Sequence, residues 1–232
     1  MNSNPRRVFL QTAGATLVVV PFVETTFGVA QKRPETDPVL RELARQAKVL
    51  AQQIAKSNAL PSGEGARHAA SVLRLLAAHG ASNGFDARVG KALRTAIAEK
   101  GRQAILNRRP DLAVVAAELG ISADVARIGV SPDDPAARSA ALDVILKNGV
   151  SSGWLAVAQE LESIATRMDK QRGVQLIRQD PNCGSGQWAL FMAEVSMIMS
   201  CSYGLVTGPE TCAVATAMYL FLRFALITMG CG

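Results

Sequence analysis

The sequence predicts an all-α fold, an irregular helical bundle that ends in an apolar helical hairpin locked by disulfides. Apolar residues make up 49% of the chain but aromatic residues only 5%, so Ala, Leu and Val must supply the core. Small aliphatic side chains of this kind favour closely packed helices over a β-sandwich. Apolar residues also recur at spacings of three and four along most of the chain, which is the helical period. All four cysteines fall near the C-terminus, on two apolar segments.

Composition divides the chain into three parts. Residues 1–30 have a pattern of their own, residues 31–180 form a basic amphipathic helical domain, and residues 181–232 form the cysteine-containing apolar hairpin. The net charge is +6, and because the first part contributes +1 and the last −1, the central domain carries +6. Its arginines are scattered, with few aromatic residues between them to stack on bases. We interpret them as a solvated helical surface, and nucleic acid is not an expected partner.

The central domain begins with two predicted helices. Asp37 fits a helix N-cap, with Pro38 at the first helical position. Pro-Ser-Gly at residues 61–63 breaks this helix, and the second is expected to end at Gly80, since a residue without a Cβ suits a helix C-terminus. The buried face of the first helix is marked by Leu40, Leu43, Ala47, Leu50 and Ile54.

Further helices are expected over residues 86–107, 135–147 and 152–170. The first of them is weakened by Gly101, and Asp134 is the expected N-cap of the second. Each should bury one face against its neighbours and leave the other in solvent.

A short segment of the central domain resembles the turn of a bacterial helix-turn-helix. It is Ala-Ala-Glu-Leu-Gly-Ile-Ser, residues 116–122. The helix that would follow, residues 123–128, has Arg127 as its only long basic side chain. Such a helix is poorly suited to read base edges, so a simple corner between two helices is the better interpretation.

The two C-terminal segments differ from the rest because they are apolar on all sides. Between residues 187 and 204 the only charged residue is Glu194, and between residues 211 and 230 the only one is Arg223. Helices of this kind must be buried against other helices or in lipid. Glu194 and Arg223 lie about one helical turn out of register across the hairpin, and we expect them to form a buried ion pair, which lowers the cost of burying either charge alone.

The cysteines are arranged symmetrically about the turn between these helices. Cys183 and Cys231, and likewise Cys201 and Cys212, are centred near residue 207, within the turn-forming sequence Gly-Leu-Val-Thr-Gly-Pro. An antiparallel hairpin would bring both pairs together, so this nested pairing is favoured among the three pairings that four cysteines allow. Each disulfide would stabilise the fold by about 2–4 kcal/mol.

The cysteines do not have the spacing of a zinc site, which usually includes a Cys-x-x-Cys pair. The two histidines, His68 and His79, lie on the second helix about 16 Å apart along its axis, so they cannot share a ligand or relay a proton. We interpret both as partly buried structural residues. No metal site and no cofactor are expected.

Established catalytic motifs are absent from the sequence, including the nucleophile elbow, the zinc-protease motif and phosphate-binding loops. Glu160 and Glu162 are two residues apart on one helix and do not face each other. Ser185 lies in a flexible Cys-Gly-Ser-Gly segment with no base nearby in the sequence. We therefore expect a protein that is not an enzyme.

The N-terminus reads Met-Asn-Ser-Asn-Pro-Arg-Arg-Val-Phe-Leu-Gln, in which the paired Arg6 and Arg7 are followed, after one residue, by Phe9 and Leu10. This pattern resembles the twin-arginine (Tat) signal peptide. An apolar stretch follows over residues 12–23, too short to span a membrane. The resemblance implies export of a folded protein.

The small residues Gly28-Val29-Ala30 match the two positions that a signal peptidase reads, so cleavage is expected between Ala30 and Gln31. The mature chain of about 200 residues is long enough to bury one core. We expect it in the periplasm or outside the cell, where its cysteines would oxidise.

Three functions are consistent with this reading. The favoured hypothesis is an exported, non-catalytic helical binding or scaffold protein of the cell envelope or exterior, with an envelope or extracellular partner that the sequence does not identify. The second is a precursor that releases its C-terminal part as a disulfide-bonded, membrane-active peptide, because the layout resembles that of halocin-type bacteriocin precursors. Its processing points would be Arg178 or residues 171–173. The third is a secreted hydrolase. Membrane contact through the hairpin stays open.

Overall fold

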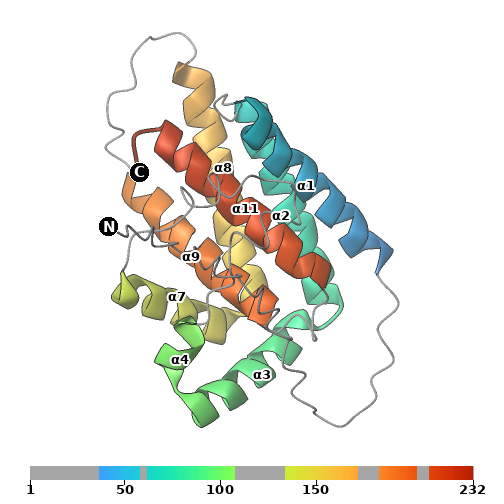
Figure 1. Ribbon diagram of the computed structural model, residues 1–232, viewed down its shortest axis with the longest axis vertical. Helices are drawn as coiled ribbons and strands as arrows, with labels where there is room; N and C mark the ends of the chain where they lie inside the picture. The colour runs from blue at the N-terminus through green and yellow to red at the C-terminus, as the bar shows by residue number, and fades with distance from the viewer. Residues whose placement is uncertain (1–36, 58–61, 108–133, 172–182, 203–208, 232) are drawn as a thin grey trace, which may run out of the picture. The chain divides into compact units, whose positions relative to one another are not determined.

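The structure is a computed structural model, which describes residues 37–57, 62–107, 134–171, 183–202 and 209–231. These residues form eight helices and no strand (Figure 1). The all-α prediction is therefore confirmed. In chain order the helices are α1 (Pro38–Ser57), α2 (Gly63–Ser82), α3 (Phe85–Lys100), α4 (Arg102–Leu106), α7 (Pro135–Asn148), α8 (Val150–Gln171), α9 (Cys183–Ser202) and α11 (Pro209–Thr228). The segment with the helix-turn-helix-like sequence lies outside the described residues, as does the N-terminal segment.

Side chains at the helix starts explain where several helices begin. Asp37 Oδ1 accepts a hydrogen bond from a backbone N–H of α1 at 2.9 Å, and Asp134 Oδ1 does the same for α7 at 2.9 Å. Ser62 Oγ accepts one from α2 at 3.0 Å. Each of these bonds satisfies a backbone donor that has no partner within the helix. The two N-caps expected from the sequence, Asp37 and Asp134, are thus confirmed.

Gly101 divides the helix expected over residues 86–107. Its backbone adopts a φ of +80°, which terminates α3, and α4 starts at the next residue. A residue with a side chain is strained at this φ, so glycine is the natural choice at the break. The short α4 places Ile105 and Leu106 in the core.

Gly80 does not end α2, contrary to the sequence prediction, because the helix continues to Ser82. Gly80 is buried at a close approach between helices. A Cβ built there would lie 3.2 Å from both Ser151 Oγ and Trp154 Cζ3 of α8. The absence of a side chain therefore serves helix packing at this position.

The hairpin, formed by α9 and α11, lies among four other helices. α9 contacts α7 and α8 as well as α11, while α11 packs most extensively on α1 (Figure 1). α2 and α8 pack along each other. We refer to α1, α2, α7 and α8 as the surrounding helices. Contacts place Pro34–Gly232 in one compact unit, so the composition boundary near residue 180 separates two parts of one packed structure.

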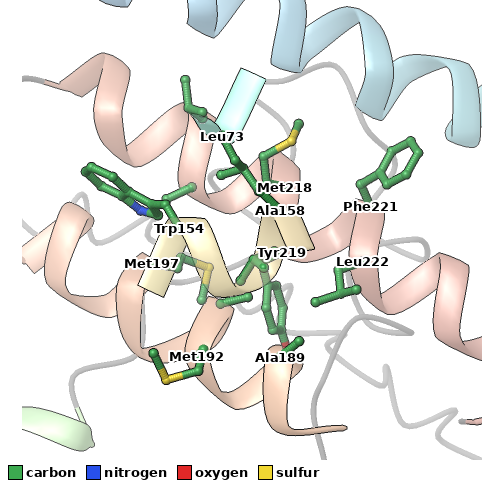
Figure 2. Close-up of a cluster of buried hydrophobic side chains, with 14 of the residues drawn as sticks. Leu73, Trp154, Ala158, Ala189, Met192, Met197, Met218, Tyr219, Phe221 and Leu222 are labelled. Atoms are coloured by element: carbon green, nitrogen blue, oxygen red, sulfur yellow. The ribbon is translucent and has the colours of Figure 1, made fainter. Parts of the chain in front are cut away.

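The middle part of each hairpin helix has no face in solvent. Every residue of α9 from 189 to 200 is buried, and so is every residue of α11 from 214 to 222. Figure 2 shows the centre of this packing, where methionines from both hairpin helices and Tyr219 lie near Trp154 and Ala158 of α8. The prediction that these all-round apolar helices are buried is confirmed, and the protein itself covers them.

Gly186 allows the two hairpin helices to approach closely. A Cβ at this position would overlap the Cδ2 atom of Leu226 on α11, and Leu226 is fully buried, so its side chain has little space to move away. Gly184 lies two residues earlier on the same helix and is exposed, with no atom within 4 Å of an added Cβ.

We expect Gly186→Ala to lower the free energy of unfolding by about 1–3 kcal/mol, since the added methyl group overpacks the contact with Leu226. Gly184→Ala is the matched control and should be neutral or slightly stabilising because alanine has the higher helix propensity. Urea unfolding of the two variants followed by circular dichroism measures the difference. An equal effect of both substitutions would contradict this account of Gly186.

Candidate functional site

The two disulfides lie at opposite ends of the hairpin. Cys183 is bonded to Cys231 with a Cα–Cα distance of 5.3 Å, and Cys201 to Cys212 with a Cα–Cα distance of 4.5 Å. The nested pairing expected from the sequence is confirmed. It follows from helix geometry, because Cys183 and Cys201 are 18 residues apart, which is five full turns and returns both cysteines to one face of α9.

Every crosslink in the protein is internal to the hairpin. The chain has four cysteines, none of them free, and both bonds join residues of the segment 183–231. The only covalent connection between the hairpin and the surrounding helices is therefore the peptide chain at residues 172–182. Non-covalent packing alone keeps the hairpin in place between these helices.

A buried ion pair joins the hairpin to α7. Glu194 of α9 and Arg138 of α7 are 2% and 4% exposed, and Arg138 Nη1 lies 3.7 Å from Glu194 Oε1. The sequence led us to expect Arg223 as the partner of Glu194. Arg223 is only half-buried and forms no ion pair within the described residues. The expectation was wrong because it considered the hairpin alone, whereas α9 also packs against α7.

The carboxylates of α8 have separate partners. Glu160 is buried and accepts a hydrogen bond of 2.5 Å from Arg167 on the same helix. Glu162 pairs at the surface with Arg74 of α2 at 2.6 Å. These two carboxylates therefore do not act as a pair, as their spacing in the sequence predicts.

A shallow apolar groove with a volume of about 590 Å³ lies between α1 and α2. Two of its apolar side chains, Val39 and Leu75, are 46% and 52% exposed. At its rim, the Arg45 guanidinium donates hydrogen bonds that lower the pKa of Glu42 to about 2, with a further contribution from Gln46. The lining residues are Pro38, Val39, Glu42, Leu43, Gln46, Leu75, Ala78, His79 and Ser82.

The arrangement that most resembles catalytic machinery is formed by Asp37, His79 and Ser82, and the last two of these line the groove. His79 Nε2 lies 2.8 Å from Asp37 Oδ2, and the ring packs edge-on against Phe85. The Ser82 hydroxyl, however, donates to the backbone oxygen of His79 at 3.0 Å and not to its ring. A nucleophile activated by a histidine is bonded to the ring nitrogen, and Ser82 does not make this bond. The contact between Asp37 and His79 joins the start of α1 to the last turn of α2.

The second histidine has a different environment. His68 is exposed, contrary to the expectation that both histidines are partly buried, and its Nε2 lies 3.4 Å from Gln46 Oε1. His79 is partly buried as expected. Ser185 is exposed in the first turn of α9. No cluster of three or more metal-ligating side chains occurs among the described residues.

We expect the Arg138–Glu194 pair to show strong mutual dependence. Arg138→Leu and Glu194→Leu should each lower the free energy of unfolding by about 3–5 kcal/mol, because each leaves a buried charge without its partner. The double variant should be more stable than either single variant. The exposed pair of Arg74 and Glu162 is the control, with an expected coupling of about 0.2–1 kcal/mol. Additive losses at Arg138 and Glu194 in urea unfolding would contradict the coupling.

The disulfides should differ in their contribution to stability. The stabilisation expected from chain entropy is about 4 kcal/mol for the bond between Cys183 and Cys231, which are 48 residues apart. It is about 3 kcal/mol for the bond between Cys201 and Cys212, which are 11 residues apart. Replacing each pair by alanine and measuring urea unfolding tests this order. A larger loss from the double substitution at Cys201 and Cys212 would contradict it.

One described helix segment, Glu210–Ile227 of α11, is long and apolar enough to cross a membrane by length and composition, with a mean hydropathy of 1.5, and 67% of it is buried inside the protein. A buried core helix passes the same test.

No protein-family model, curated protein or solved structure matches the chain.

Proposed function

We propose that the chain is an exported, non-catalytic helical protein of the cell envelope or exterior that carries the disulfide-locked hairpin as its core. The two disulfides are the observation that supports this most directly, because such bonds form and persist in oxidising compartments. The paired arginines of the N-terminus, Arg6 and Arg7, point in the same direction through their resemblance to a twin-arginine signal.

The shape of the surface supports a binding role. The groove between α1 and α2 is concave and mostly apolar, and Val39 and Leu75 leave about half of their surface in solvent there. Concave apolar surfaces with a few polar groups at the rim are typical of binding sites. The polar side chains at the groove are engaged with one another, as in the pair of His79 and Asp37.

A second function, release of the hairpin as a peptide, is favoured by the covalent topology. Both disulfides lie within residues 183–231, so one cut in the segment 172–182 would release the two helices as a single covalent unit. Arg178 and residues 171–173 are the processing points that the sequence suggests. The released hairpin would remain bound to the surrounding helices until their packing opened.

Export and oxidation are tested together by changing the signal. With Arg6 and Arg7 both replaced by lysine, we expect the protein to stay in the cell with four free thiols, while the wild-type protein outside the cytoplasm has none. Arg33→Lys, beyond the expected cleavage site, is the control and should be exported normally. Cell fractionation with thiol labelling reads out both properties, and free thiols in the exported protein would disprove the proposal.

The choice between the two functions depends on the size of the exported product. A binding or scaffold protein should appear as one chain of about 200 residues that begins at Gln31, as expected for one domain-sized core. A precursor should yield a fragment of about fifty residues that begins between residues 172 and 183 and contains both disulfides. Intact-mass measurement of exported material distinguishes them, and the shorter fragment would overturn the scaffold function.

A further inference from the structure

We propose that the hairpin is a bilayer-spanning unit which leaves the surrounding helices to enter anionic lipid, and that Glu194 is the main barrier to this insertion within the hairpin itself. The inference deepens the proposed function and rests on it, because an exported protein meets membrane surfaces with its disulfides formed. It names a lipid bilayer as the partner of the hairpin. Four features of the structure support it.

The first feature is the dimension of the hairpin. α9 and α11 have 20 residues each, so each is about 30 Å long, which matches the hydrocarbon core of a bilayer. Of the two, α11 also has the apolar composition of a membrane span, and α9 does not. Their backbone donors and acceptors are satisfied within the helices, as a lipid environment requires. The Cys201–Cys212 bond holds one end of the pair together and the Cys183–Cys231 bond the other.

The second feature is that the hairpin has no polar face. Residues 189–200 of α9 are all buried, and a helix that packs on a soluble core normally leaves one polar side for water. The exposed residues of α9 are instead confined to its first turns, where Trp188 is 39% exposed. Tryptophan near the end of an apolar helix is typical of the membrane interface.

The third feature is that insertion requires no covalent bond to break. No disulfide joins the hairpin to the surrounding helices, and the connecting segment 172–182 provides the only covalent tether. Separation exchanges apolar contacts with α1, α7 and α8 for contacts with lipid tails. The net charge of +6 on residues 31–182 attracts an anionic bilayer and brings the hairpin to it.

The fourth feature identifies the barrier. Glu194 lies near the middle of α9, so insertion would place its carboxylate near the bilayer centre while its partner Arg138 stays behind on α7. A charged side chain at that depth is costly. Arg223 lies five residues before the end of α11, and its long side chain can extend toward the headgroups.

Tryptophan fluorescence tests the separation, because the chain has only two tryptophans, one on the hairpin and one on α8. The oxidised exported protein is mixed with vesicles of phosphatidylcholine and phosphatidylglycerol that contain brominated lipid. In Trp154→Phe, the remaining Trp188 should be quenched, most strongly by bromines near the headgroups. In Trp188→Phe, the remaining Trp154 should not be quenched.

Three outcomes of the quenching experiment would overturn the proposal. The first is that Trp188 is not quenched, and the second is that Trp188 and Trp154 are quenched equally. The third is that vesicles of pure phosphatidylcholine quench Trp188 as strongly as vesicles that contain phosphatidylglycerol. The wild-type protein is measured in parallel, so a folding defect of Trp154→Phe cannot hide the result. Its absolute loss of emission should equal that of the variant that retains Trp188, while its quenched fraction should be smaller because Trp154 still emits.

The role of Glu194 is tested with a matched pair of variants. Glu194→Gln and Arg138→Gln both disrupt the same buried pair, but only the first removes the charge from the hairpin. Glu194→Gln should reach half-maximal quenching at about tenfold lower lipid concentration than the wild type, and Arg138→Gln should change much less. Equal shifts in the two variants would show that loosening of the bundle sets the barrier and would overturn the assignment to Glu194.

The proposed function and the lipid inference fail in different ways. If the protein is exported with both disulfides formed and Trp188 stays unquenched, only the lipid inference is lost. If the protein remains in the cytoplasm with free thiols, the proposed function is lost whatever the vesicle experiment shows.

Discussion

The structure depends on one constraint, which is that a helix with apolar side chains on every side has to be removed from water. α9 and α11 are two such helices in one chain, and burying them requires contacts from several directions. α7 and α8 provide these contacts for α9, and α1 provides them for α11. The amphipathic character of α1 and α8 fits this arrangement, because each packs an apolar face against the hairpin and leaves polar residues in solvent. The salt bridges between α2 and α8 lie at the surface, as at Arg67 and Asp169.

Close approach of helices is the second requirement of this arrangement, and glycine makes it possible at several contacts. Gly153 of α8 lies so near to α9 that an added Cβ would overlap Ser196 Oγ, and Gly80 of α2 faces α8 in a similar way. Both would be read from the sequence as weak points in a helix. Their function becomes visible only when the neighbouring helix is known. This is why Gly80 was mistaken for a helix end.

The sequence predicted the features that depend on one or two helices. Helical periodicity gave the α-class, Asp37 and Asp134 gave two helix starts, and the symmetric cysteines gave the pairing of both disulfides. Features that depend on a third helix were missed. Glu194 has its ion-pair partner on α7, and no spacing within the hairpin could reveal Arg138. The proximity of Asp37 to His79 also depends on how α1 crosses the end of α2.

The nested disulfides have a consequence for the fate of the C-terminal part after proteolysis. A protease that cuts the chain between Cys201 and Cys212 would open the backbone without separating α9 from α11, because both bonds bridge the break. The nicked product would keep the mass of the uncut chain plus one water, and its two pieces would part only in reductant.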